Sequence, residues 1–132
     1  MIKRALSCAA LTLSAMTVSL ADAAPAQAAY RYGSFVLNNP SNVTIYYQVK
    51  WGNNNWENFS VGPGEWHAHY VDLGADQMIP IPYVRFDFVT WDQSVTYQTY
   101  EMDAYGTYDR NEGKDYTFQY TSDGRFLDLF ED

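Results

Sequence analysis

The sequence predicts an all-β protein, an antiparallel β-sandwich of about seven to eight strands, with a small β-barrel as the alternative. Short runs rich in Val, Ile, Thr, Tyr and Phe alternate apolar and polar residues, and turn residues separate them roughly every ten positions. No stretch after residue 28 keeps a helical period. The chain holds 4 Trp, 12 Tyr and 7 Phe, more than one small core encloses, so we expect several aromatic rings at the surface.

Residues 1–28 have the layout of a secretory signal peptide. Lys3 and Arg4 place positive charge near the start, residues 5–20 form an apolar run, and small residues dominate positions 21–29. With these flanks, the apolar run is too short to be a membrane-spanning helix. We therefore expect an exported protein that is periplasmic or secreted and has no membrane span.

Cleavage is expected after Ala28, with Ala23 as the alternative, which leaves residues 29–132 as a single β-sandwich domain. The sole cysteine, Cys8, lies in the leader. The domain is therefore expected to contain no disulfide, although export usually permits one.

The expected strands follow one another at regular spacing. They cover residues 33–37, 43–51, 56–61, 66–71, 83–90, 95–102, 116–121 and 125–130. Residues 72–82 and 104–114 are expected to form loops. The last two strands turn at Asp123-Gly124, a strong two-residue hairpin signal, which places Tyr120 opposite Leu127.

Residues 43–51 alternate most clearly, and one face of this strand is expected to enter the core. That face comprises Val43, Ile45, Tyr47, Val49 and Trp51. A hairpin loop follows at residues 52–55. Matching the apolar faces of the two strands then pairs Val49 with Phe59 and Tyr47 with Val61. Trp56 is expected at the loop tip, partly exposed.

The segment Gly62-Pro63-Gly64-Glu65 suits a type II turn, with Pro in the second position and Gly in the third. A hairpin closed on this turn pairs Val61 with Trp66. The core would then receive Trp66, Ala68 and Tyr70, and the outer face would receive His67 and His69.

These registers predict a polar grid on the outer face of the sheet. Lys50, Asn58 and His69 form one row, and Gln48, Ser60 and His67 form the next. Polar groups in such a grid can hydrogen-bond a sugar or a peptide, although many antiparallel sheets simply have one solvated face. The candidate ligand-binding residues are Tyr46, Gln48, Lys50, Trp56, Asn58, Ser60, His67, His69 and Trp91.

Two segments have partial metal-ligand spacing. His67 and His69 place two imidazoles on one face, with Glu65 as a third candidate ligand, which suits Zn²⁺ or Cu²⁺. Residues 109–115 space oxygen ligands two apart, as Ca²⁺ loops do, but Lys114 stands where an EF-hand needs glycine. Both patterns are incomplete, so we predict no metal site and no cofactor.

Catalysis and nucleic-acid binding both lack support in the sequence. Residues 29–132 contain no cysteine and no Gly-x-Ser-x-Gly elbow. The net charge is −8, which disfavours a nucleic-acid partner. We therefore expect a protein that is not an enzyme.

The chain resembles a group of small exported bacterial all-β proteins. The residues that carry the resemblance are the strand 45–52 that ends in Trp-Gly, then Trp56, the Pro-Gly turn 62–64, His67 and the closing hairpin 116–129. The resemblance implies the β-sandwich fold and no particular activity.

The predicted function is a non-catalytic binding module outside the cytoplasm, with a carbohydrate or a protein as the ligand. Exposed aromatic rings at Tyr46, Trp56 and Trp91 can stack on sugars or form a protein contact surface. An envelope structural protein is an alternative, and a metal-binding protein or an enzyme that uses His67 and His69 ranks after it.

Overall fold

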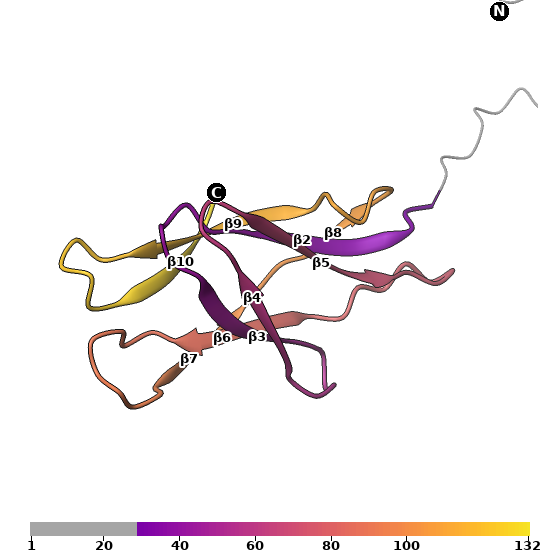
Figure 1. The fold of residues 1–132 in the computed structure, drawn as a ribbon. Helices are drawn as coiled ribbons and strands as arrows, with labels where there is room; N and C mark the ends of the chain where they lie inside the picture. Colours follow the sequence, from indigo (N-terminus) through magenta and orange to yellow (C-terminus); the bar gives the residue numbers. More distant parts are fainter. Residues whose placement is uncertain (1–28) are drawn as a thin grey trace, which may run out of the picture.

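The computed structural model describes residues 29–132, and the predicted signal peptide lies outside the described residues. The described chain forms nine strands in two sheets, which face each other as the layers of a β-sandwich (Figure 1). The predicted sandwich is confirmed, with one strand more than the upper expectation.

The first layer, called the β2 sheet, has the strand order β10-β9-β2-β5, and β8 also pairs with β2. Its strands are β2 (Tyr32–Asn38), β5 (Trp66–Asp72), β8 (Tyr105–Thr107), β9 (Lys114–Tyr120) and β10 (Leu127–Glu131). The second layer, called the β3 sheet, has the order β4-β3-β6-β7. Its strands are β3 (Ile45–Trp51), β4 (Glu57–Val61), β6 (Pro82–Asp87) and β7 (Tyr97–Glu101).

Alternate residues of the strands meet between the two layers and form the core. The buried cluster comprises Phe35, Leu37, Ile45, Tyr47, Val49, Val61, Val84, Phe86, Met102, Tyr116, Phe118, Leu127 and Leu129. The expected inward face of β3 is confirmed, since Ile45, Tyr47 and Val49 are buried and Tyr46 is exposed. Val43 is exposed instead, because it precedes β3.

The closing hairpin has the predicted register. Tyr120 pairs with Leu127 and Phe118 pairs with Leu129. The turn holds Gly124 at a φ of 73°, a conformation that glycine adopts at little cost. Apolar alternation and a two-residue turn signal were sufficient to define this hairpin.

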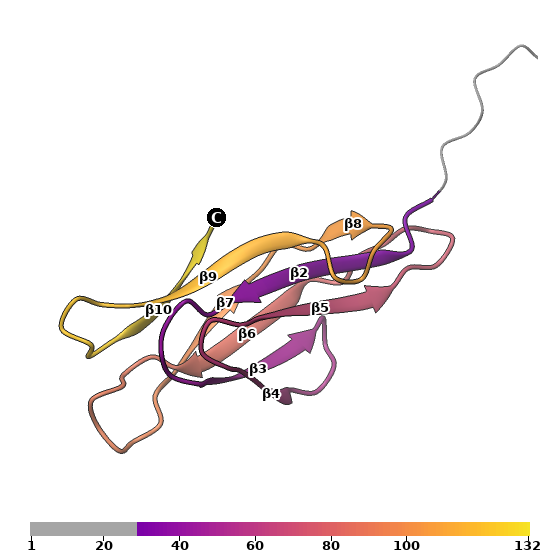
Figure 2. The same ribbon diagram turned by 45° about the horizontal axis from the view of Figure 1, so that its top comes forward.

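Two features of the β2 sheet differ from the prediction. β2 and β9 pair in parallel, so this sheet is mixed, and Figure 2 shows β2 between β9 and β5. Residues 105–107, expected in a loop, form β8 against β2. Both differences arise because β2 takes its partners from distant segments, and the alternation within a strand does not identify its neighbours.

The β3–β4 hairpin has a shifted register. Tyr47 pairs with Phe59 and Val49 pairs with Glu57, so the predicted pairing of Val49 with Phe59 is wrong. The shift is two residues, so every side chain stays on its predicted face. Val49 lies opposite Glu57, so the hairpin closes two residues tighter than predicted, and residues 50–56 connect the last paired residues.

The turn after β4 is present, but it joins the two sheets and not two strands of one hairpin. Glu65 N donates a hydrogen bond to Gly62 O over 3.1 Å, and Gly64 has a φ of 70°, as a type II turn requires. Asn39 Nδ2 fixes the crossing by donating to Val61 O and Gly62 O, each over 3.0 Å. The chain passes here from the lower layer to the upper layer (Figure 1).

This crossing reverses the predicted faces of β5, which pairs with β2 and not with β4. His69 is buried and His67 half-buried, whereas Trp66 and Tyr70 are exposed and Ala68 is half-buried. The predicted outward placement of the two histidines and the predicted burial of the two aromatic rings are therefore wrong. Because β5 lies in the layer opposite to the predicted one, the side of the strand that faces the core is the other one.

Candidate functional site

The outer face of the β3 sheet brings most of the predicted site residues together. Gln48 pairs with Asn58, and Tyr46 pairs with Ser60, across β3 and β4. Gln48 Nε2 donates to Asn58 Oδ1 over 2.6 Å. Tyr46 is 74% exposed, so its ring is open to a ligand.

Sequence reasoning missed one residue of this face, Arg85. Gln48 pairs with Arg85 across β3 and β6, and Arg85 Nε donates to Gln48 Oε1 over 2.6 Å. Val84 and Phe86 face the core, and Arg85 lies between them on the other face of β6, so its outward direction was predictable from the alternation. Its place beside Gln48 was not, because that depends on which strand pairs with β3.

A line of alternating rings and cations crosses the same face, and we call it the cation–π ladder. It consists of Tyr83, Lys50, Trp56, Arg85 and Tyr97. Lys50 Nζ lies 5.5 Å from the Tyr83 ring centre and 5.1 Å from that of Trp56. The guanidinium carbon of Arg85 lies 4.2 Å from the Trp56 ring centre and 4.5 Å from that of Tyr97.

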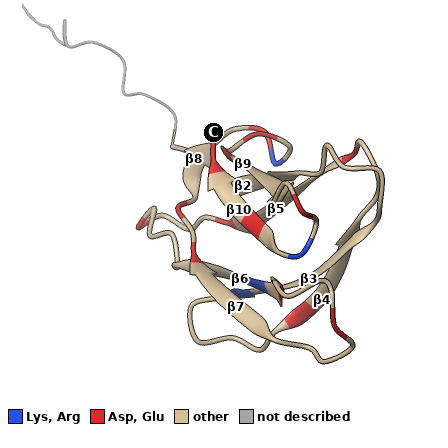
Figure 3. Cartoon of the chain, turned by 90° about the vertical axis from the view of Figure 1, so that its left-hand side faces the viewer, with Lys and Arg blue, Asp and Glu red and all other residues tan. Residues whose placement is uncertain are grey.

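Trp56 is half-buried within this ladder, which matches the expected partial exposure. Rings attract cations through the negative charge of their faces, so the ladder holds Lys50 and Arg85 in place. In Figure 3 the blue segments of the β3 sheet lie in the middle of the sheet, whereas the red segments lie mainly at edges and loops.

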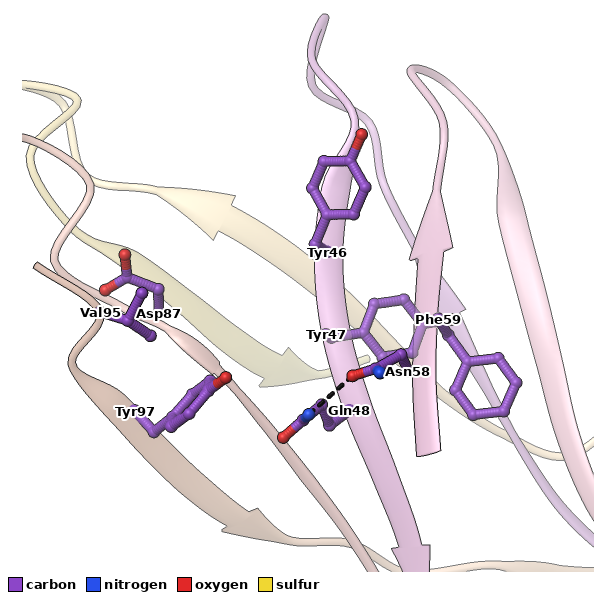
Figure 4. Close-up of a pocket in the computed structure, with 8 residues that line it drawn as sticks. All are labelled: Tyr46, Tyr47, Gln48, Asn58, Phe59, Asp87, Val95 and Tyr97. Carbon is purple, nitrogen blue, oxygen red and sulfur yellow. Dashed lines mark hydrogen bonds between the residues drawn. The ribbon is translucent and has the colours of Figure 1, made fainter. Parts of the chain in front are cut away.

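A hollow of about 270 Å³, called the Tyr46 pocket, lies beside the ladder. Its lining comprises Tyr46, Tyr47, Gln48, Asn58, Phe59, Asp87, Val95 and Tyr97. Figure 4 shows Tyr46, Gln48 and Asn58 on one side of the hollow, and Asp87, Val95 and Tyr97 on the other. The walls are therefore aromatic and the polar groups are few, as in small-molecule sites.

The carboxylate of Asp87 is fixed in this pocket by the backbone. Its Oδ1 accepts hydrogen bonds from Val89 N over 3.3 Å and from Thr96 N over 3.0 Å. Within residues 29–132, Asp87 Oδ2 and Asn58 Nδ2 make no hydrogen bond. The pocket therefore presents a free acceptor and a free donor.

His67 and His69 lie on the inner side of the sandwich, away from the polar grid. Tyr47 Oη is 3.1 Å from His67 Nδ1 and 2.8 Å from His69 Nε2, so one phenol hydroxyl bridges both imidazoles. Burial, with the neighbouring His67 charge, lowers the pKa of His69 to about 3. Burial also raises the pKa of Tyr47. His69 is therefore neutral at neutral pH.

These histidines border a second hollow, the inter-sheet cleft, of about 430 Å³. It is lined by Trp51, Asn54, Glu57, Phe59, His67, Ala68, His69, Tyr70 and Val71. In residues 29–132, no group of three or more His, Cys, Asp or Glu side chains is placed to hold a metal ion. The two imidazoles serve instead as hydrogen-bond partners of Tyr47.

The Asp109–Asp115 segment is organised by its own backbone. Asp109 Oδ1 accepts a hydrogen bond from Asn111 N over 2.9 Å, and Glu112 N donates to Asp109 O over 3.1 Å. Lys114 forms an ion pair with Glu131. The segment covers the outer side of β2, where Ser34 Oγ donates to Glu112 O.

Trp91 lies apart from the Tyr46 pocket. It is 56% exposed in the β6–β7 loop, and the guanidinium carbon of Arg125 lies 4.6 Å from its ring centre. The structure therefore brings Tyr46, Gln48, Lys50, Trp56, Asn58 and Ser60 onto one face and leaves His67, His69 and Trp91 elsewhere.

No family model, curated protein or solved structure matches the chain. No helix within residues 29–132 is long and apolar enough to cross a membrane.

Proposed function

We propose that the protein is a non-catalytic binding module that acts outside the cytoplasm and holds a carbohydrate in the Tyr46 pocket. The observation that carries this proposal is the pocket itself, which places exposed aromatic rings beside a small set of polar groups on the outer face of a rigid sheet. Such half-wet sites suit rings with a polar edge, such as Tyr and Trp.

The polar groups of the pocket match the hydroxyl groups of a sugar. Asn58 Nδ2 can donate a hydrogen bond and Asp87 Oδ2 can accept one, and each lacks a partner within residues 29–132. Gln48 already forms hydrogen bonds with Asn58 and Arg85, so it orients these two side chains. The contacts with the ligand are then made by its neighbours. The stacking surface is the ring of Tyr46.

Action outside the cytoplasm is supported by the signal-peptide layout of residues 1–28 in the sequence. Seven of the eight lining residues lie on β3, β4, β6 and β7, with Val95 in the loop before β7, and strands keep the geometry of a site fixed before the ligand arrives.

A protein partner is the second candidate. Trp66 and Tyr70 are exposed on β5, which is an edge strand of the β2 sheet. Exposed aromatic rings beside a free edge are typical of surfaces that bind another chain. This surface lies on the opposite layer from the Tyr46 pocket, so the two candidates are separable.

Titration of the purified protein with a panel of neutral and acidic oligosaccharides tests the proposal. The indole N–H signals in a nitrogen–proton NMR spectrum report binding, and Trp56→Phe identifies the signal nearest the pocket. We expect one glycan class to move the Trp56 signal, and Tyr46→Ala to weaken that binding about tenfold or more.

Tyr105→Ala is the matched control, because Tyr105 is also an exposed tyrosine but lies on β8 of the other sheet. It is expected to leave the binding unchanged. A panel without any binding, or binding that Tyr46→Ala does not affect, would exclude the pocket as a carbohydrate site.

A further inference from the structure

Within residues 29–132, the cations of the ladder lack carboxylate partners. The ion pair found in residues 29–132 joins Lys114 to Glu131, on the other sheet. The chain has 16 acidic and 8 basic residues, so carboxylates are abundant. Lys50 and Arg85 nevertheless share the Trp56 ring, and no acid of the described part of the chain lies within ion-pair distance of either. Two like charges are thus held side by side on a solvated face.

Arg85 is oriented so that one edge of its guanidinium remains free. Its Nε is used by Gln48, and the rings of Trp56 and Tyr97 lie at 4.2 Å and 4.5 Å from the guanidinium carbon. The two terminal nitrogens make no hydrogen bond within residues 29–132. An arginine fixed in this way presents two parallel N–H donors, which match the two oxygens of a carboxylate.

Arg85 also lies next to the Tyr46 pocket. It contacts Gln48 and Tyr97, and both of these line the pocket. Arg85 is half-buried, and a charge that is partly shielded from water interacts more strongly with an anion.

Negative charges surround the site and limit which anion fits. Asp87 lines the pocket two residues beyond Arg85, Glu101 pairs with Tyr83 on the ladder, and Glu57 begins β4 next to Trp56. Together with the net charge of −8, these acids repel a ligand that carries many negative charges. They favour a ligand with hydroxyls for Asp87 and one carboxylate for Arg85.

We infer that the ligand of the Tyr46 pocket is a carboxylated sugar, with the uronic acid type as the simplest case. Arg85 binds the carboxylate through its terminal nitrogens, Lys50 adds the second positive charge, and Tyr46 stacks on the sugar ring. This inference rests on the proposed carbohydrate function and adds the chemical class of the sugar.

The test compares an oligosaccharide that carries a single galacturonic acid residue with its methyl ester, which has the same rings without the charge. NMR titration at low salt is expected to give binding to the acid about tenfold or more tighter than to the ester. Arg85→Gln and Lys50→Gln are each expected to remove most of this preference. Arg31→Gln, which removes an exposed charge near Tyr32 on the other sheet, is expected to retain it.

Thermal melts identify any variant that fails to fold, and Arg85→Lys then provides a second version that retains the charge but loses the paired donors. It is expected to keep binding and lose most of the preference for acid over ester. Equal binding of acid and ester by the wild-type protein would overturn the inference and leave the carbohydrate proposal intact.

A short glutamate peptide serves as the third probe. Binding as tight as that of the sugar acid, with the same loss in Arg85→Gln, would overturn the sugar assignment in favour of an acidic protein segment. If no oligosaccharide in either form binds, both the inference and the proposed function fail together.

Discussion

The guanidinium carbon of Arg85 lies 4.2 Å from the ring centre of Trp56. Arg85 stands on β6, and Trp56 lies just before β4, two strands away across β3. The contact therefore reaches across β3 and links one edge of the β3 sheet to its centre. It also fixes the charge that borders the Tyr46 pocket.

Replacement of Trp56 by Ala is expected to release both cations of the ladder. Each cation–π contact at a partly exposed site contributes about 0.5–1 kcal/mol, so we expect a loss of about 1–2 kcal/mol of unfolding free energy, measured by urea denaturation. Sugar-acid binding is expected to weaken in the same variant. Trp91→Ala, which removes a contact with Arg125 away from the pocket, is the control. A loss of about 3–5 kcal/mol would instead identify Trp56 as a core residue.

The unfolding free energy is expected to fall as the pH is lowered from neutrality. The pKa of His69 is lowered from 6.5 in the unfolded chain to about 3 in the fold, mainly by burial and then by the charge of His67. Between these two pKa values, His69 is therefore protonated in the unfolded state and neutral in the folded state. The stability that this gives is complete above pH 6.5 and is lost progressively down to about pH 3.

Between about pH 7 and about pH 5, this single group is expected to remove about 2 kcal/mol. Urea denaturation at several pH values measures the slope. His69→Gln, which cannot titrate, is expected to flatten it. An unchanged slope in His69→Gln would show that other groups cause the pH dependence.

Asn39→Asp is expected to destabilise the crossing between the two sheets. Asn39 is 1% exposed, and its Nδ2 donates to three backbone carbonyls, those of Val43, Val61 and Gly62. A carboxylate cannot donate to these oxygens, and its charge would be buried beside them. We expect a loss of about 3 kcal/mol or more in chemical denaturation. Asn53→Asp in the exposed β3–β4 loop is the control and is expected to change little.

Gly113→Ala is expected to push the 108–113 loop away from β2. A Cβ at this position would overlap the Ser34 carbonyl and lie 2.8 Å from Phe35 N, which are backbone atoms that cannot rotate aside. We expect a loss of about 2 kcal/mol or more, read as a lower melting temperature. Gly74→Ala, whose Cβ would meet only Asp76 Oδ1 at 3.7 Å, is expected to be neutral. Equal melting temperatures for the two variants would contradict the close approach.

Local patterns were sufficient for the fold class and for the direction of most side chains. The inward face of β3, the outward Gln48 and the closing register of Tyr120 with Leu127 all follow from alternation and turn chemistry. The outward residues of β3 and β4 were placed on one face even though the register was two residues out, because an even shift preserves the faces.

The partners of β5 could not be predicted in the same way. The turn from Gly62 to Glu65 has the sequence of a hairpin turn, and nothing within it distinguishes a hairpin from a crossing between layers. The buried Asn39, distant in sequence, holds the crossing through its hydrogen bonds to Val61 O and Gly62 O. For this reason His67 and His69 were predicted on the outer grid, whereas they lie on the inner side of the sandwich. Arg85 was not among the predicted site residues, because the strand that pairs with β3 beside Gln48 was not known.

The parallel pairing of β2 with β9 has a consequence for the order in which the chain can assemble. Phe35 pairs with Lys114, so β2, the first strand of residues 29–132, pairs with one of the last strands to be synthesised. Until β8 and β9 have been synthesised, β2 has β5 as its only partner within residues 29–132. Closing so long a loop is slow, since the entropy cost precedes the contacts that repay it. A nascent chain therefore cannot complete the β2 sheet until nearly all of its residues have been translated, and β2 stays accessible to chaperones until then.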